Sequence, residues 1–266
     1  PSSAASDVYK RQAEKRSLWQ NLTEMWRMQS YRRILLSGLL RTPSGLMNLL
    51  QMTVLSYYFG NNGRTPYVHY MLLLGIPAFL GQLIAAGAAP KLADKHGAAT
   101  TFAQANVFAG LALLAAFALF LCRPQQLTQA LPFTLLILLL FCNMFCCGLV
   151  NTVQSILIAD AADLTEKESG IRRDGIFVSG QSLLIKLSTG VSALLQGLVF
   201  AISGFSGTAV RQINRALYAG ADFATDPSFA TPRFAMFFLF LCLPGIAYLL
   251  SALPYRKGRN PHKAPV

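Results

Sequence analysis

The sequence has little charge, few histidines and no nucleotide-binding loop. Only 13% of its 266 residues are charged, about half the fraction usual in a soluble domain, and 53% are hydrophobic. The three histidines, His69, His96 and His262, are too far apart for metal-ligand spacing. No Gly-x-x-x-x-Gly-Lys-Ser/Thr motif is present, so nothing indicates an ATP-driven pump. We therefore predict no cofactor, no metal site and no enzyme activity.

Neither the cysteines nor the positive charge indicates a secreted or nucleic-acid-binding protein. The five cysteines lie in or at the ends of apolar segments, where we interpret them as small hydrophobic residues and not as a disulfide framework. The net charge of +12 is carried by residues in loops between apolar segments, so we expect a lipid bilayer as the surrounding medium and no nucleic acid as partner.

Six apolar segments dominate the chain, and each is close to or above the roughly 20 residues that a helix needs to cross a bilayer. They are residues 34–59, 68–89, 100–122, 131–158, 176–203 and 234–254. Backbone polar groups inside a bilayer must be hydrogen-bonded within a helix or a closed barrel. The sequence therefore predicts an all-α membrane protein with six transmembrane helices over residues 34–254. The fourth and fifth segments are long enough to tilt or to extend beyond the lipid.

The flanking segments have different origins. Residues 2–12 match, residue by residue, the translation of a transposase adapter used to prepare sequencing libraries, so we exclude residues 1–12 from functional argument and expect an upstream half to be missing. Residues 13–33 carry Leu18, Trp19, Leu22 and Trp26 at helical spacing and predict an amphipathic linker helix on the membrane surface. Residues 255–266 form a basic tail.

Lysine and arginine are concentrated in one set of loops, which indicates the cytoplasmic side. That set holds Arg32, Arg33, Lys91, Lys95, Lys167, Arg172, Arg173, Arg256, Lys257, Arg259 and Lys263. The other set has Arg64, Arg123, Arg211, Arg215 and Arg233. We therefore predict a multi-pass protein of the plasma (inner) membrane with both termini in the cytoplasm. The external segment 206–231 predicts a short amphipathic helix, either a lid or a solvated connector.

A polar cassette separates the fourth and fifth apolar segments, and a single charge, Lys186, follows inside the fifth. The cassette contains Asp160, Asp163, Gly170, Arg172, Arg173, Asp174 and Gly175. We interpret it as a charged cytoplasmic turn between two helices. A lysine inside a spanning helix is costly unless it faces a cavity or a partner, so Lys186 is predicted to be buried and functional. Ser182 and Thr189 share its helical face.

This cassette with its internal lysine resembles the glycoside-pentoside-hexuronide:cation symporters, the melibiose permease-like family of the major facilitator superfamily. Two positions depart from the family pattern: Asp174 stands where the family often has Glu, and Leu164 where an aromatic residue is expected. The resemblance covers residues 17–259 and corresponds to the C-terminal half of such a transporter only.

The resemblance implies both a fold and a function. The fold is the C-terminal six-helix half of a major facilitator. The function is that of a fragment of a secondary active transporter, which couples the uptake of a sugar (a glycoside, pentoside or hexuronide) to a sodium, lithium or proton gradient by alternating access. The partners are then a sugar-like substrate and a missing N-terminal half that holds the main cation-binding carboxylates. Two alternatives stay open: a transporter of a non-sugar solute such as a lysolipid, and a non-transporting membrane scaffold or sensor subunit.

Seven residues are predicted to face the substrate or cation cavity: Lys186, Arg41, Asn48, Asn143, Asn151, Gln154 and Gln181. In the fourth apolar segment, helical spacing places Asn143, Cys147, Asn151 and Gln154 on one side. Amide side chains donate and accept, so they suit sugar hydroxyls, but they bridge helices equally well. Arg41 lies some seven residues into the first span, just before Pro43, where it either gates an opening or extends to the lipid headgroups.

A cytoplasmic gate is predicted from charged residues at the ends of spans. Its members are Asp160, Asp163, Arg172, Arg173, Asp174 and Asp94. Salt bridges from these residues to the other half would hold one state and break on switching. Topology setting and helix capping are the alternative roles, and for Asp94 the alternative is an ordinary tight turn over residues 90–97.

Overall fold

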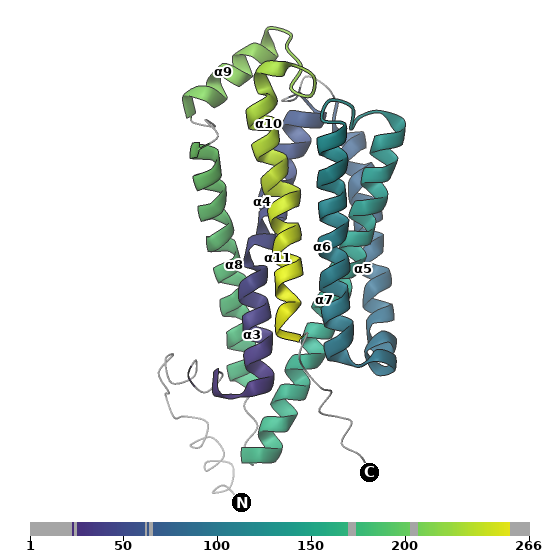
Figure 1. The fold of residues 1–266 in the computed structure, drawn as a ribbon, viewed down its shortest axis with the longest axis vertical. Coiled ribbons are helices and arrows are strands. Elements are labelled where there is room, and N and C mark those ends of the chain that lie inside the picture. The colour runs from purple at the N-terminus through teal and green to yellow at the C-terminus, as the bar shows by residue number, and fades with distance from the viewer. Residues whose placement is uncertain are drawn as a thin grey trace, which may run out of the picture.

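The computed structural model describes residues 23, 26–61, 63, 66–169, 174–202 and 207–255. Within these ranges every regular element is helical, which confirms the all-α fold (Figure 1). Five helical segments are long and apolar enough to cross a membrane. Residues 29–59 form a further segment that lies among them (Figure 1). The described chain is therefore a bundle of membrane-spanning helices, as predicted.

The first segment is not one continuous α-helix. It consists of α3 (Gln29–Arg41), the 3-10 turn η1 (Thr42–Gly45), α4 (Leu46–Val54) and the π-helical turn η2 (Leu55–Phe59). Pro43 lacks an N–H and interrupts the hydrogen-bond ladder. The carbonyl oxygen of Thr42 instead accepts hydrogen bonds from the hydroxyls of Ser188 (2.8 Å) and Ser192 (3.1 Å). The break is thus stabilised by hydroxyl groups where water would be scarce.

Three long helices form the opposite side of the bundle: α5 (Val68–His96), α6 (Ala98–Cys122) and α7 (Ala130–Ser169). Small residues let α5 and α7 approach closely, because a Cβ on Gly148 would lie 2.7 Å from the Cβ of Ala85. Gly97, with φ of 85°, is the whole connection between α5 and α6. The prediction of a loop over residues 90–97 was therefore wrong.

The last segment is again interrupted. It comprises η3 (Pro227–Phe229), α10 (Ala230–Phe237), the π-helical turn η4 (Phe238–Cys242), α11 (Leu243–Ser251) and η5 (Leu253–Tyr255). A Cβ on Gly110 of α6 would lie 2.7 Å from the carbonyl oxygen of Gly245, so α6 and α11 touch backbone to backbone. The Ser251 hydroxyl donates to Asn106 of α6 (2.7 Å), and Ser37 of α3 donates to the Ser251 carbonyl (2.6 Å). These contacts fix α11 between α3 and α6.

Two helices remain, α8 (Asp174–Ile202) and α9 (Gly207–Tyr218). Figure 1 shows α9 lying across one end of the bundle, above α8. It is amphipathic, with Ile213 and Leu217 buried. Only 11% of the apolar window of α8 is buried, against 50% for α7. Most of α8 therefore faces the outside of this body.

The end of the bundle near α9 is held by a buried arginine. Arg233, only 4% exposed, donates to the carbonyl oxygens of Phe223 (2.9 Å) and Ala224 (2.7 Å). Asn61 joins the same region to the first segment, because its side-chain oxygen accepts from the Phe223 N–H (2.9 Å). We call the described residues 219–229 and their partners Asn61 and Arg233 the outer clamp.

Two predicted boundaries differ from the structure at the opposite end. α7 is helical through Ser169, so the turn predicted to begin at Asp160 is instead an extension of the helix. The predicted surface helix over residues 13–33 is also wrong in its last turn, because α3 runs from Gln29 directly into the first span. There the hydroxyl of Tyr31 is buried and donates to the Phe177 carbonyl (2.8 Å). Residues 1–22 and 256–266 lie outside the described residues.

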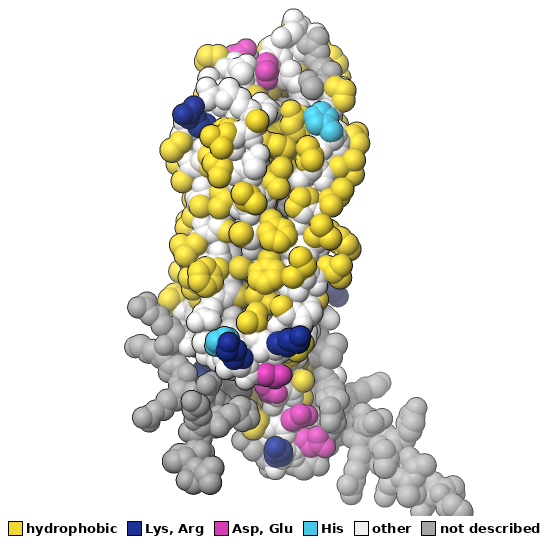
Figure 2. Space-filling view, turned by 90° about the vertical axis from the view of Figure 1, so that its right-hand side faces the viewer, with side chains coloured by type: hydrophobic (Ala, Val, Ile, Leu, Met, Phe, Trp, Pro, Cys, Tyr) yellow, Lys and Arg dark blue, Asp and Glu magenta, His cyan; other side chains and the backbone are white. Residues whose placement is uncertain are grey.

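The surface that includes α5 has the pattern expected for lipid. Leu72, Ile76, Phe79 and Leu83 of α5 are all at least half exposed. Figure 2 shows a broad apolar band on this side, with basic and acidic side chains gathered below it at one end. An apolar band of this extent on a soluble protein would be an aggregation hazard, whereas in a bilayer it is solvated by acyl chains.

Candidate functional site

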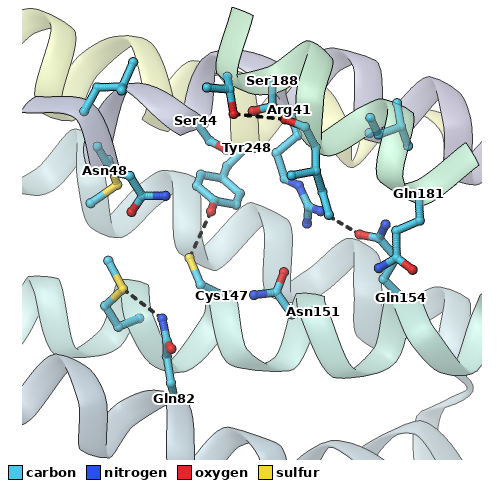
Figure 3. Close-up of a pocket in the computed structure, with 18 of the residues that line it drawn as sticks. Arg41, Ser44, Asn48, Gln82, Cys147, Asn151, Gln154, Gln181, Ser188 and Tyr248 are labelled. Carbon is cyan, nitrogen blue, oxygen red and sulfur yellow. Dashed lines mark hydrogen bonds between the residues drawn. The ribbon is translucent and has the colours of Figure 1, made fainter. Parts of the chain in front are cut away.

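A cavity of about 690 Å³ opens in the middle of the bundle, between the first segment, α7 and α8 (Figure 3). Its volume lies in the range of small-molecule binding sites. Single residues from α5 (Gln82) and α11 (Tyr248) complete the lining. The polar lining residues are Arg41, Ser44, Asn48, Gln82, Asn151, Gln154, Ser155, Gln181, Ser188, Thr189 and Tyr248. This is a concentration of hydrogen-bonding groups inside an apolar bundle.

Arg41 supplies the charge of the cavity. It is the last residue of α3, so the break at η1 leaves it at the cavity wall. Its Nη2 donates to Oε1 of Gln154 on α7 at 2.6 Å, and its Cζ lies 6.0 Å from the centroid of the Phe102 ring. Figure 3 shows the guanidinium directed at α7, where Asn151 and Gln154 lie. Among the described residues no acidic side chain lines the cavity.

One face of α7 brings its polar residues to the cavity. Cys147, Asn151 and Gln154 are spaced four and three residues apart, which places them on the same side of a helix. The sequence predicted this face from the same spacing. Asn48 comes from α4 and Gln181 from α8, so the amides converge from different helices. Five of the seven predicted cavity residues therefore line the cavity.

The other two predicted residues do not line it. Asn143 is completely buried and donates to the carbonyl oxygen of Ala109 (3.2 Å), so it bridges α7 to α6. Lys186 is exposed on α8, while its neighbour Ile185 lines the cavity. The prediction of a buried Lys186 is wrong for this six-helix body, because few residues of the chain cover α8.

Sequence reasoning missed several polar lining residues, among them Ser44, Gln82, Ser155, Ser188 and Tyr248. Ser44 lies in η1, and its position depends on the break in the helix. The hydroxyl of Tyr248 lies 3.0 Å from the Sγ of Cys147, at a buried contact between α11 and α7. Gln82 donates to the sulfur of Met144 (3.4 Å). Gln82 could have been found, since it is an amide inside a long apolar run, whereas nothing in the sequence distinguishes Tyr248 from other tyrosines.

The predicted gate residues lie away from the cavity. Asp94 is exposed in the last turn of α5, and Asp160 and Asp163 are exposed on the extension of α7. Asp174 is the first residue of α8. Arg172 and Arg173 lie outside the described residues. The gating role of these six residues stays a prediction. Among the described residues, no cluster of histidine, cysteine and acidic side chains could hold a metal ion.

Comparisons with known proteins agree with this architecture. A family model described as MFS/sugar transport protein matches residues 2–257. An uncharacterized 29.9 kDa protein in the crtE 3'region of Pseudescherichia vulneris is 26% identical over 167 residues, which cover 63% of this chain and 56% of that protein. The chain thus aligns with little more than half the length of the curated relative it matches. No solved structure matches the chain significantly.

Proposed function

Since the chain belongs to the MFS/sugar transport protein family of the major facilitator superfamily, we propose that it is the C-terminal six-helix half of a cation-coupled sugar symporter. In this proposal the chain provides one wall of the transport cavity, and a second six-helix half packs against it. The observation that carries the proposal is the mid-bundle cavity, which is lined by five amide side chains, four serine or threonine hydroxyls, one arginine and Tyr248. Such groups match the hydroxyls of a sugar, which both donate and accept.

The exposure of α8 supports a second half. Polar Ser182, Lys186 and Thr189 are exposed on a helix of membrane-spanning length. A lysine is costly against lipid and is stabilised by a carboxylate or a cavity. Gly190 and Gly197 of α8 have open space where a Cβ would be, so another helix could approach closely there. We infer that this face of α8 meets the second half.

Coupling to an ion then depends on the second half. No acidic residue lines the described cavity wall, and sodium, lithium or protons need a carboxylate or a similar oxygen ligand. The second half would therefore supply the ion-binding carboxylates. Alternating access follows if the two halves rock about the central cavity, with Asp94, Asp160 and Asp163 at the border that opens and closes. We place this border, and both termini, at the cytoplasmic face of the plasma (inner) membrane.

The proposal is tested by reading the source DNA upstream of codon 13. An open frame with six further apolar spans that contain carboxylates is the expected result. The restored protein should then accumulate labelled sugar in vesicles only when a sodium or proton gradient is imposed. A start codon directly before Ala13 would overturn the assignment as a C-terminal half. Gradient-driven uptake by vesicles that contain the 266-residue chain alone would overturn it as well.

A further inference from the structure

We propose that one face of α9 binds the headgroups of anionic phospholipids at the end of the bundle near the outer clamp. The face consists of Arg211, Arg215 and Tyr218, and we call it the cationic face of α9. The inference goes beyond the proposed function, because it needs only that the bundle lies in a bilayer. It applies to a transporter and to a membrane scaffold alike.

The position of α9 is the first step of the argument. The membrane-spanning part of α8, Ser179–Ile202, has 24 residues, and a helix of that length extends over about 36 Å. The hydrocarbon core of a bilayer is about 30 Å thick, so the end of α8 reaches the headgroup layer. α9 begins at Gly207, five positions after Ile202, and lies across the end of the bundle above α8 (Figure 1). We therefore place α9 at the level of the lipid phosphates.

The apolar face of α9 is already occupied by the bundle. Ile213 and Leu217 are buried in the main hydrophobic core. Between them, the side-chain oxygen of Asn214 accepts a hydrogen bond from the Tyr57 hydroxyl (3.1 Å). Amphipathic surface helices usually insert their apolar face among the acyl chains, but this face of α9 packs against protein instead. Contact with lipid is therefore left to the polar face.

That polar face combines two kinds of side chain that suit a phospholipid headgroup. Arg211, Arg215 and Tyr218 are spaced four and three residues apart, which places them along one side of the helix. All three are exposed, Tyr218 by 70%. Arginine binds phosphate through several N–H donors in one plane. Tyrosine is enriched at membrane interfaces because it has an apolar ring and a polar hydroxyl.

Within the described part of the chain, no acidic side chain neutralises the cationic face. The guanidinium of Arg211 donates to the Gly207 carbonyl of its own helix (3.2 Å), and α9 contains no acidic residue. In the outer clamp, Asp222 and Asp226 each accept a hydrogen bond from the backbone N–H two residues further on, so their carboxylates hold turns of the clamp. Anionic headgroups attract basic residues near the membrane surface, and their phosphates supply the missing negative charge.

The test measures which lipid surrounds α9. Tyr218→Trp introduces an indole into the cationic face, in a background where Trp19→Phe and Trp26→Phe remove the native tryptophans. The 266-residue chain is placed in phosphatidylcholine nanodiscs with a small, varied fraction of lipid that carries bromine near the glycerol end of its acyl chains. Bromine quenches the fluorescence of nearby indoles. We expect quenching to rise about fivefold more steeply with brominated phosphatidylglycerol than with brominated phosphatidylcholine, and added salt to reduce this ratio.

Two further variants assign the effect to α9. Arg211→Gln combined with Arg215→Gln should bring the two slopes to within a factor of about two, because the charges are lost while the buried face remains. Arg123→Gln is the matched control: it removes an exposed arginine at the C-terminal end of α6, whose side chain donates to Gln126 (2.8 Å), and should leave the ratio unchanged. If the double variant does not fold, the ratio measured with both arginines present decides by itself.

Equal slopes with both arginines present would overturn the inference and leave the cationic face to water. A ratio that persists in the double variant would overturn it as well, because the enrichment would then come from charges elsewhere in the chain.

Two other occupants of the face are distinguished by the same approach. Equal slopes together with a rise in unfolding temperature that inorganic phosphate causes only when both arginines are present would indicate a free anion. A preference that disappears once the upstream spans are restored would assign the face to the second half of the protein. Either result overturns the binding of lipid. The proposed function is decided separately, by the upstream reading frame and by gradient-driven uptake.

Discussion

Arg41 and Arg233 are both arginines within helices of the same bundle, but their surroundings differ. Arg233 is buried in the outer clamp, where two backbone carbonyl oxygens accept from it within 2.9 Å. Arg41 has one short hydrogen bond, to Gln154, and lies at the wall of a cavity. A polar group that its own chain satisfies stabilises the fold, whereas one with spare donors beside a cavity is available to a ligand. By this criterion Arg233 stabilises the fold, whereas Arg41 is available to bind a solute.

The largest effect on stability is expected for Arg233→Met. The carbonyls of Phe223 and Ala224 would lose a charged donor in a buried region, at a cost of about 3 kcal/mol. Thermal unfolding in detergent, followed by circular dichroism, measures this change. Arg123→Met, at an exposed position, is the matched control and should have little effect. An equal loss in both variants would contradict a special role for the outer clamp.

Two glycine-to-alanine substitutions compare a tightly packed helix contact with an open helix face, and the expected change in stability is smaller than for Arg233→Met. A Cβ at Gly110 would lie 2.7 Å from a backbone oxygen of α11, so Gly110→Ala forces two helices apart at a cost of about 2 kcal/mol. At Gly197 on α8 no atom lies within 4 Å of such a Cβ. Gly197→Ala should therefore leave the unfolding temperature of this chain unchanged or slightly raised. The expectation fails if the two variants unfold at the same temperature.

Arg41→Gln should change stability by less than about 1 kcal/mol, because glutamine can still hydrogen-bond Gln154 and one charge is removed from an unpaired position. Its effect on function should be large, with loss of solute uptake by the restored transporter. Paired measurements of unfolding temperature and uptake check this division. A destabilisation as large as that of Arg233→Met would show that Arg41 is structural and would erase the contrast.

The smallest effect concerns pH at the outer clamp. The hydroxyl and the backbone N–H of Ser228 donate to Oδ1 of Asp226 (2.7 and 2.8 Å), and they hold the pKa of Asp226 below its ordinary value. Because the folded pKa is depressed, this stabilisation is present above the pKa of the unfolded chain and is lost as the pH falls through the folded pKa. Unfolding temperatures measured against pH should drop less in Asp226→Asn than in the unaltered chain. Parallel curves would show that Asp226 does not contribute.

The sequence predicted the helices better than their ends. Long apolar runs mark spans because the backbone must be hydrogen-bonded inside lipid. The extension of α7 beyond residue 158 carries Asp160, Glu166 and Lys167, which look like a turn by polarity. Glutamate and lysine are good helix formers, so a helix that leaves the lipid can continue through them in water. Polarity identified the border of the membrane and not the end of the helix.

The candidate site was predicted in part for a related reason. Helical spacing placed Asn151 and Gln154 on one face, and the structure has both at the cavity. The same spacing included Asn143, which instead bonds to Ala109 of α6. Whether an amide side chain hydrogen-bonds a solute or bridges two helices depends on which helix lies opposite. The spacing of residues along the sequence does not determine which helix that is. Lys186 shows the same limit, because its exposure depends on what packs against α8.

By itself, the sequence determined that this protein is a helical membrane bundle, since runs of apolar residues leave the backbone no other way to satisfy its hydrogen bonds. It also determined which polar side chains lie at membrane depth. Only the tertiary structure decided which of them meet. The break at η1 leaves Arg41 beside Gln154, and the close approach of α6 and α11 at Gly110 fixes the helix that carries Tyr248. Those arrangements follow from side-chain packing between segments far apart in the chain, which no local pattern encodes.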